Sequence, residues 1–275
     1  MKEHTKTALL LEQLVADSDY SNLMIPETEP EQRKLIRSLM NIRMPRQANE
    51  NLLQLQDDYL QETLMEKGIV SLADIPTIQQ QYGSTLPFAD RISLWQGDIT
   101  RLKAGAIVNA ANSRMLGCFV PCHHCIDNAI HSAAGIQLRL ECDQIMEQRR
   151  QHGIPYEEPV GTATLTRSYN LPCDYVIHTV GPIVYEGLTP ALCRDLRSCY
   201  EAALTCCIEH HIRSIAFCCI STGEFHFPND KAAEIAVKTV TDVLEARGGD
   251  CMERVIFNVF KDTDLDIYKR LLTGS

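Results

Sequence analysis

A short stretch near the middle of the chain concentrates side chains that bind soft metal ions. Residues 117–131 read GCFVPCHHCIDNAIH, with three cysteines and two adjacent histidines within eight positions and an aspartate just after them. Thiolate sulfur and imidazole nitrogen are the ligands that Zn²⁺ prefers in proteins, and three such ligands leave a fourth tetrahedral position open to water or substrate. The stretch is therefore a structural zinc clip, a redox-active thiol cluster or the reactive centre of an enzyme.

The composition restricts the class of protein around this stretch. With 26 basic and 36 acidic side chains the formal net charge is -10, which argues against the basic stripe that nucleic-acid binders usually carry. The first residues, MKEHTKTALLLEQLVADS, lack the apolar core of a signal peptide, so the 12 cysteines are expected to be reduced. No apolar run approaches the roughly 20 residues of a membrane span. We expect a cytoplasmic protein that binds neither nucleic acid nor membranes.

Two regions of the chain differ in hydrophobic pattern. From residue 1 to about 88, apolar residues recur at three-to-four spacing, with breaks at Gly68 and Pro76, which predicts amphipathic helices that need a partner surface. After that, short apolar runs alternate with longer amphipathic stretches, a pattern typical of an α/β domain with a largely parallel sheet. We therefore expect an N-terminal helical extension, 1–88, and an α/β domain, 89–275. The expected strands begin near residues 92, 106, 163, 175, 214 and 254, and the expected helices cover 125–150, 190–211, 230–246 and 263–273.

Polar side chains follow the first two expected strands of the α/β domain. In such sheets ligands bind beyond the carboxyl ends of the strands. The motif WQGDIT places Asp98 there, where its carboxylate can accept from an exocyclic amine or simply cap a helix. VNAANS places Asn109 and Asn112 there, and their amides suit sugar hydroxyls, although asparagine is also common in turns. Alone, each motif is a weak indication of a ligand site.

Two further motifs follow the last two expected strands. In CCISTGEFHFPNDK, Ser221, Thr222 and Gly223 precede a helix that begins near Asn229. Successive backbone N–H groups there can form an anion-binding concavity for a diphosphate, although the same residues also fit a plain strand-to-helix turn. FNVFKD places Phe260 where its ring either stacks on a base or fills the core, and the burial habits of phenylalanine alone favour the core.

Together these motifs resemble the macrodomain family over about residues 89–275. The segments WQGDIT, VNAANS, GTATLTRSYNLPCDYVIHTVGP, ISTGEFHFPNDKAAEIA and FNVFKDTDLDIY occur in the order and spacing of that family. The resemblance implies a three-layer α/β/α sandwich with a mixed central sheet, and ADP-ribose as the ligand. His178 also matches the family, and we interpret it as a hydrogen-bonded strand histidine rather than a catalyst. The implied ligand contacts are Asp98, the Ile99 amide and Phe260 at the adenine, Asn112 and Phe227 at the distal ribose, and Ser221, Thr222, Gly223, Glu224 and Phe225 at the diphosphate.

The opening stretch departs from the hydrolytic macrodomains, in which this segment is usually glycine-rich. It resembles instead the zinc-dependent subgroup found in microbes, which often carries a helical extension of the kind expected here. That resemblance implies one Zn²⁺ per chain, held by Cys118, His123 and Cys125. Cys122 and His124 alternate with these ligands, and neighbouring residues tend to point apart. We therefore favour an open three-ligand site over a closed structural site or a metal-free thiol cluster.

The function implied by the resemblance is hydrolysis of an ADP-ribose linkage. Asp127 is an expected catalytic residue that orients or deprotonates the nucleophile, because hydrolytic relatives place an aspartate there, and Asn112 is the second. Either Asp127 or the zinc activates the nucleophile, and the alternative for Asp127 is a helix cap. The expected reaction removes mono-ADP-ribose from modified protein side chains, with a lipoyl-carrier protein modified by a sirtuin-type transferase as the implied partner. Two alternatives stay open: a module that binds ADP-ribose without cleaving it, and a hydrolase of a free derivative such as O-acetyl-ADP-ribose. The metal ligands argue against the first, since recognition needs no Lewis acid.

Overall fold

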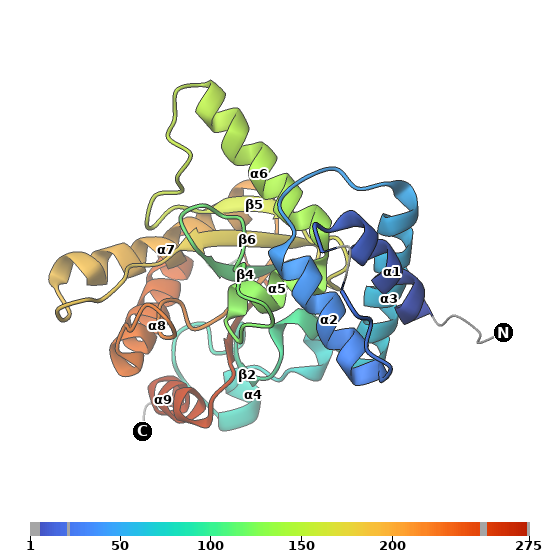
Figure 1. Cartoon of the computed structure of the whole chain (residues 1–275). Coiled ribbons are helices and arrows are strands. Elements are labelled where there is room, and N and C mark those ends of the chain that lie inside the picture. Colours follow the sequence, from blue (N-terminus) through green and yellow to red (C-terminus); the bar gives the residue numbers. More distant parts are fainter. Residues whose placement is uncertain (1–5, 21–22, 248–251, 274–275) are drawn as a thin grey trace.

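A mixed β-sheet forms the centre of the computed structural model, which describes residues 6–20, 23–247 and 252–273 (Figure 1). Its strands are β2 (Ile92–Gln96), β4 (Ala106–Ala111), β5 (Thr164–Arg167), β6 (Tyr175–Val180), β7 (Ser214–Phe217) and β8 (Arg254–Val259). They pair in the order β2-β8-β7-β4-β6-β5. Neighbouring strands are parallel, except that β5 is antiparallel to β6. The expected largely parallel sheet is therefore confirmed.

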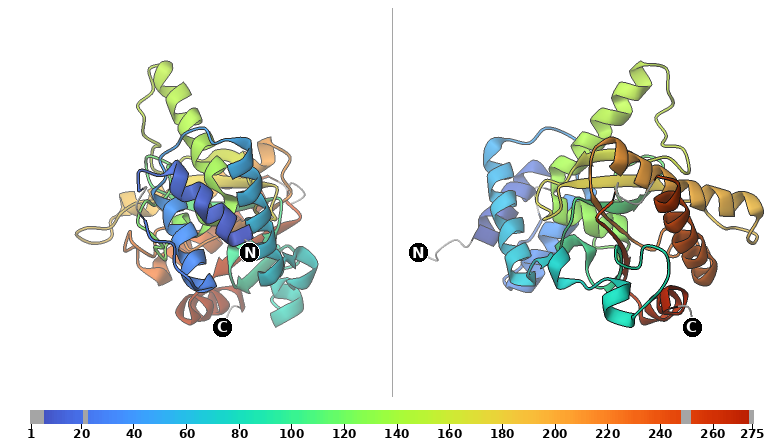
Figure 2. Two further views of the ribbon diagram at one scale, coloured as in Figure 1. Left: turned by 45° about the vertical axis from the view of Figure 1, so that its right-hand side comes forward. Right: turned by 180° about the vertical axis from the view of Figure 1, so that it is seen from behind.

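Helices cover both faces of the sheet (Figures 1 and 2). One face carries α5 (Ile126–Ala134) and α6 (Ile136–Gln151), which contact β4 and β5. The other face carries α7 (Pro190–Glu209), α8 (Asn229–Ala246) and α9 (Asp262–Thr273), which pack on one another and on the strands. The expected α/β/α sandwich is confirmed, and the last three helices agree closely with their expected positions.

The single helix expected over 125–150 is wrong, because the chain breaks at Gly135. This glycine has a φ of 100°, a backbone conformation that other residues rarely adopt. A Cβ atom there would also lie 2.6 Å from Nε2 of Gln56. The break leaves α5 as a separate helix of 9 residues, and this helix carries Asp127.

The N-terminal region forms helices that lie beside α5 and α6 (Figure 2). These are α1 (Lys6–Asp17), α2 (Glu29–Ile42) and α3 (Glu50–Lys67). They share an apolar core of their own, which α6 joins through Ile136. The fully buried Gln56 of α3 accepts a hydrogen bond of 2.8 Å from the Ile136 N–H. The amphipathic helices thus find their partner surface on α6.

The segment after α3 already belongs to the sheet domain. Gly68, with a φ of 77°, ends α3 as expected. Next, β1 (Val70–Ser71) pairs in parallel with β3 (Leu102–Lys103), and α4 (Ile78–Tyr82) packs on α9 and β2. The domain boundary expected near residue 88 stays a prediction, although the segment between α3 and residue 88 packs with the sheet domain. Short 3-10 turns are η1 (Leu72–Asp74) and η2 (Ile99–Arg101).

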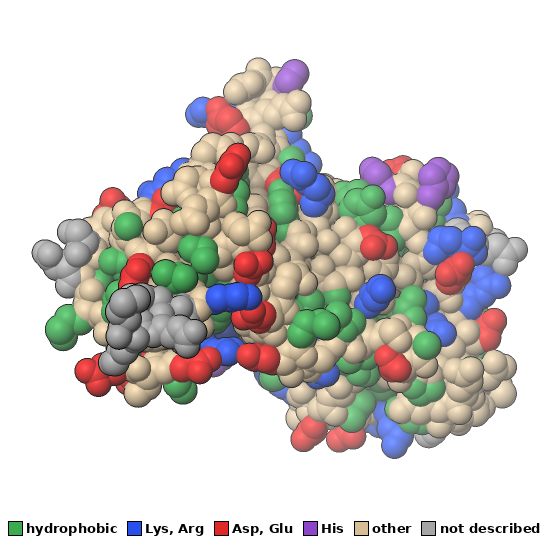
Figure 3. All heavy atoms as spheres, turned by 90° about the vertical axis from the view of Figure 1, so that its right-hand side faces the viewer, with side chains coloured by type: hydrophobic (Ala, Val, Ile, Leu, Met, Phe, Trp, Pro, Cys, Tyr) green, Lys and Arg blue, Asp and Glu red, His purple; other side chains and the backbone are tan. Residues whose placement is uncertain are grey.

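The surface agrees with the acidic composition. On the face shown in Figure 3, acidic and basic side chains of the described residues are interspersed rather than gathered into one basic stripe. Counter-ion release along a nucleic-acid backbone requires such a stripe. Among the described residues, none of the helices combines the length and the apolar character that crossing a bilayer requires.

Candidate active site and metal centre

The expected ligand-binding loops gather at one edge of the sheet. Strands β2, β8, β7, β4 and β6 run parallel, so their carboxyl ends meet there. The chain leaves β4 through residues 112–125 into α5, and leaves β7 through residues 218–228 into α8. Asp98 and Phe260 follow β2 and β8. Parallel pairing therefore brings together motifs that lie far apart in the sequence.

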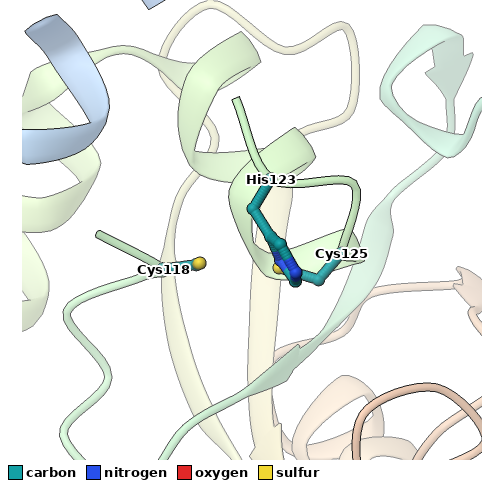
Figure 4. A group of neighbouring side chains, drawn as sticks. All are labelled: Cys118, His123 and Cys125. Atoms are coloured by element: carbon teal, nitrogen blue, oxygen red, sulfur yellow. The ribbon is translucent and has the colours of Figure 1, made fainter. Parts of the chain in front are cut away.

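Cys118, His123 and Cys125, here called the metal cluster, point toward one another (Figure 4). Each residue offers one ligand atom, and these atoms lie within 4.8 Å of one another. Cys125 is the N-cap of α5, and its Sγ accepts a hydrogen bond of 3.4 Å from the Asn128 N–H. Nδ1 of His123 is buried and has no hydrogen-bond partner among the described residues, a condition that calls for an unseen partner. Two thiols and an imidazole with an orphaned nitrogen fit Zn²⁺.

The remaining cysteine and histidine of the stretch lie outside the metal cluster. Sγ of Cys122 is 3.2 Å from Oγ of Ser38 and 3.5 Å from the Lys34 carbonyl, so it faces α2. His124 is exposed. The Cys122 thiol thus points toward α2 and away from the metal cluster, and the choice of the three ligands stays a prediction.

Asp127 lies in the first turn of α5 and is nearly buried, with 6% of its surface exposed. Nδ2 of Asn109 donates to one carboxylate oxygen at 2.8 Å, and Nδ2 of Asn112 donates to the other at 3.2 Å. Burial raises the pKa of Asp127 to about 6, against the opposing effect of these hydrogen bonds and of the Arg139 charge. The helix-cap alternative is wrong, because Cys125 occupies the cap position.

Two buried histidines lie behind this carboxylate. Nδ1 of His178 is 3.1 Å from Nδ2 of Asn109, and its Nε2 is 2.9 Å from Oγ1 of Thr166. Burial lowers the pKa of His178 to about 3, so the ring is neutral, and its interpretation as a hydrogen-bonded strand histidine is confirmed. The second ring, His131, has Nε2 at 3.5 Å from Asp127, and burial lowers its pKa well below the usual value. Sequence reasoning missed His131, although its i+4 spacing from Asp127 was a signal.

At the other end of the edge, Asp98 caps the short turn η2. Its Oδ1 accepts from the N–H and the hydroxyl of Thr100 at 3.0 and 2.6 Å, and its Oδ2 lies 3.3 Å from Nζ of Lys67. Burial acts to raise the pKa of Asp98, but Thr100 and Lys67 together hold it below the ordinary value. The ring of Phe260 is 77% exposed, so the alternative that it fills the core is wrong. Ile99 is buried, which leaves its backbone as the part able to meet a ligand.

The loop after β7 has the form expected of an anion site. Ser221 has a φ of 64°, and its carbonyl accepts from the Phe227 N–H at 2.9 Å. Among the described residues, the N–H groups of 223–225 donate to no other protein group. The N–H of Thr222 is used differently, since it lies 3.4 Å from the Cys219 carbonyl. Free successive amides are the donors that a diphosphate requires.

The anion loop and the metal cluster meet at Glu224. Its Oε1 lies 3.7 Å from Nε2 of His123, although most of the Glu224 side chain is exposed. Phe227, at the end of the same loop, is 1% exposed and packs in the main core. Its expected contact with the distal ribose stays a prediction. The structure thus brings Asn112, Asp127, the metal cluster and the anion loop to one end of the sheet edge.

Comparison with known proteins identifies this arrangement. Residues 108–236 match the Macro domain family. A Treponema medium protein named protein-ADP-ribose hydrolase is 46% identical over 275 residues, covering 99% of this chain and 100% of that protein. A Staphylococcus aureus (strain MSSA476) protein of the same name is 42% identical over 265 residues, or 94% of this chain and 93% of that one. A Trypanosoma brucei macrodomain solved in complex with ADP-ribose has a TM-score of 0.64 and 26% identity, with 90% of this chain and 96% of that chain covered. The chain therefore belongs to the macrodomain family.

Proposed function

We propose that this chain is a zinc-dependent hydrolase that removes mono-ADP-ribose from modified protein side chains. The observation that carries the proposal is the convergence of Cys118, His123 and Cys125 next to Asp127, whose carboxylate Asn112 helps to hold. Binding alone requires neither a Lewis acid nor a base, whereas hydrolysis is accelerated by either of them. The relatives named protein-ADP-ribose hydrolase and the related structure that contains ADP-ribose support the same reaction and ligand.

The ligand follows the strand ends from β2 to β4 in this proposal. Asp98 and the Ile99 N–H receive the adenine, and the exposed ring of Phe260 stacks on it. The free amides of 223–225 bind the diphosphate without a basic side chain. Asn112 then receives the distal ribose. This orientation puts the anomeric carbon, which bears the modified side chain, beside the metal cluster.

The chemistry falls to Asp127 and the groups that hold it. Zn²⁺ bound by the metal cluster would supply Lewis-acid polarisation at the distal ribose. One oxygen of Asp127 takes a proton from a water molecule, while the amides of Asn109 and Asn112 keep the carboxylate in place. The water oxygen bonds to the anomeric carbon, and the bond from that carbon to the protein side chain breaks with its electron pair on the side chain. The proton then passes to the departing side chain, which leaves free ADP-ribose and unmodified protein.

The physiological substrate stays a prediction from the resemblance to the zinc-dependent subgroup. That resemblance favours a lipoyl-carrier protein modified by a sirtuin-type transferase, and a cytoplasmic location. These predictions concern the partner and the location of the protein rather than the site. They can therefore fail while the proposed reaction holds.

A de-modification assay on mono-ADP-ribosylated protein, run together with metal analysis, tests the proposal. We expect one zinc per chain and release of ADP-ribose by the wild type. Cys125→Ala or His123→Ala should lose both zinc and cleavage, while contacts at the adenine end preserve much of the affinity for ADP-ribose. Asp127→Asn should keep zinc and slow turnover by about 10² or more, as expected for loss of a general base. Asp57→Asn is the matched control, because it alters a carboxylate bonded to Asn170 at the C-terminal end of α5, the opposite end from Cys125.

Three results would change the conclusion. A folded, metal-free ligand variant with full activity would show that zinc is not required. A wild type that binds zinc and ADP-ribose but releases none from any modified protein would be a binding module. Cleavage of O-acetyl-ADP-ribose without cleavage of modified protein would point to a free derivative as the substrate.

A further inference from the structure

One side of α2 is polar although it faces the protein rather than solvent. It lies against residues 118–125, here called the metal cluster loop. Arg37, Ser38 and Asn41 lie within one turn of this helix and each contacts the segment 118–128. The apolar residues of α2 pack elsewhere, in the core of the N-terminal helices. Helical residues three and four apart share a face, so α2 separates a packing face from a face that makes specific hydrogen bonds.

Arg37 makes the most extensive of these contacts. Its Nη2 and Nε lie 2.7 and 3.2 Å from Oδ1 of Asn128, and Nη2 also lies 3.1 Å from the His123 carbonyl. Hydrogen bonds from a charged guanidinium are stronger than those between neutral groups, and its planar fork fixes direction as well as distance. Arg37 therefore restrains both the side chain of Asn128 and the backbone at His123.

Asn128 passes this restraint to the other two metal ligands. It is fully buried. Its backbone N–H donates to Sγ of Cys125 at 3.4 Å, and its Nδ2 donates to the carbonyls of Cys118 and Val120 at 3.4 and 3.0 Å. A side-chain amide has two donors and one acceptor, and Asn128 uses both kinds here. The Arg37–Asn128 pair thus touches all three residues of the metal cluster.

The loop between Cys118 and His123 is held from α2 as well. Oδ1 of Asn41 accepts from the Cys122 N–H at 2.9 Å. Cys122 has a φ of 53°, a left-handed conformation that costs a residue other than glycine of order 1 kcal/mol or more. Such strain persists only where the surroundings fix it, and α2 supplies that surrounding.

We propose that Arg37 is a positioning residue of the metal centre, which makes the N-terminal helices a working part of the site. The inference rests on the proposed function in that the metal cluster binds zinc. Arg37 acts through Asn128 and the His123 backbone and not through the metal-binding atoms themselves. Without the guanidinium, Oδ1 of Asn128 keeps only the weaker contact of 3.3 Å from the Ser132 hydroxyl, so the carbonyls and the thiol that Asn128 fixes are freer to shift. Partners of this outer kind typically change metal affinity by about 10- to 100-fold.

The competing explanation is that Arg37 merely attaches α2 to the rest of the protein. Arg33, one turn earlier on the same helix, offers the matched control. It forms a two-pronged pair with Glu66 of α3 and an i+4 pair with Glu29. Arg33→Gln therefore removes a comparable charged contact of α2 without touching residues 118–128.

Zinc release to a chromophoric chelator, measured on the full chain, tests the proposal. We expect Arg37→Gln to release zinc about 10- to 100-fold faster than wild type, and the Co²⁺-loaded variant to show an altered thiolate-to-metal absorption band. Arg33→Gln should match wild type in both measurements. Arg37→Lys keeps one donor and the charge, so its release rate should fall between wild type and Arg37→Gln. Excess zinc should restore cleavage by Arg37→Gln, which a general folding defect would not allow.

The outcomes separate this proposal from the proposed function. Equal zinc release by Arg37→Gln and Arg33→Gln overturns the role of Arg37. If Arg37→Gln does not fold, Arg37→Lys is measured instead, and a wild-type release rate and Co²⁺ spectrum in that variant overturn the proposal too. If the wild type holds one zinc but cleaves nothing, the proposed hydrolase function is wrong, and the comparison of zinc release rates still tests the role of Arg37. If the wild type holds no zinc, both the proposed function and the role of Arg37 are wrong.

Discussion

Asn109 donates a hydrogen bond of 2.8 Å to the buried carboxylate of Asp127. Asn109 is itself fully buried, and the same amide nitrogen lies 3.1 Å from Nδ1 of the neutral His178. Because His178 accepts on one side and Asp127 on the other, the amide of Asn109 has one orientation available. The first asparagine of VNAAN therefore orients the carboxylate of Asp127, and Asn112, which is half-buried, can serve this carboxylate and a ligand together.

Asn109→Ala should slow cleavage more than it weakens ligand binding. One oxygen of Asp127 loses its fixed donor, and misplacement of a reacting group costs roughly 10- to 100-fold in turnover. Loss of a buried partner also lowers the free energy of unfolding by about 1–3 kcal/mol. Single-turnover kinetics, metal analysis and calorimetry with ADP-ribose check this.

Asn170→Ala is the matched control for that experiment. It removes another buried asparagine that donates to an aspartate, Asp57, at 2.7 Å, on the side of the N-terminal helices. It should lower stability by a similar amount and leave the turnover number unchanged. Equal turnover in the two variants would mean that Asn109 only stabilises the fold.

The strands and most helices could be predicted because the hydrophobic period changes with the element. The break at Gly135 was missed because a lone glycine inside an amphipathic stretch also fits a continuous helix. The structure alone shows its φ of 100° and the close approach of Gln56 and Gln137. Alternation along the chain was sufficient to predict that Cys122 leaves the ligand set. The roles of Arg37 and Lys67 could not be predicted, since they depend on how α2 and α3 dock, and no local pattern determines that docking.

Asp98→Ala should weaken ADP-ribose binding and leave zinc in place. The carboxylate is the expected acceptor for the adenine amine, and leaving a buried polar group without its partner costs about 1–3 kcal/mol. Lys67→Gln should instead raise the affinity for ADP-ribose, because it frees Oδ2 of Asp98 from the ion pair at 3.3 Å. Titration calorimetry at low salt measures both changes. Asp90→Ala, at a mostly exposed carboxylate, is the control, and an affinity loss in Asp90→Ala equal to that in Asp98→Ala would contradict the assignment.

Gly181→Val should disturb the anion loop and leave the metal cluster intact. A Cβ at Gly181 would lie 2.0 Å from Oγ of Ser221 and 2.9 Å from Cγ2 of Ile220. Ser221 must then rotate and the left-handed turn that it starts must shift, so we expect ADP-ribose affinity to fall by about tenfold or more, on the scale of one lost charge-assisted hydrogen bond. Ala246→Val tests whether a larger side chain is harmful in general, because Ala246 is exposed at the end of α8. Wild-type affinity in Gly181→Val would show that the loop does not need this close approach.

Arg139→Met should lower the free energy of unfolding of the protein by several kcal/mol. The guanidinium is 4% exposed and donates to the carbonyls of Leu116, Met40 and Arg43 at 2.6, 3.1 and 2.5 Å. Burial lowers the pKa of Arg139 to about 10, so the group is still charged at neutral pH. Its loss leaves three carbonyl oxygens, two at the end of α2 and that of Leu116, without their donor. Leaving three buried carbonyl oxygens without this donor costs about 3 kcal/mol or more, at roughly 1–3 kcal/mol for each.

For a chain of this size that loss corresponds to a decrease in Tm of about 10 °C, at roughly 2–4 °C per kcal/mol. Arg213→Met is the control, because its ion pair with Glu253 is 59% exposed on both sides and such pairs contribute about 0–1 kcal/mol. Differential scanning calorimetry of the zinc-loaded proteins compares the two. Since Arg139 ties α2 to the strand-end segment that begins the metal cluster loop, Arg139→Met should also release zinc faster than Arg213→Met. A variant with a lowered Tm and an unchanged release rate would separate the docking of α2 from the positioning of the metal ligands.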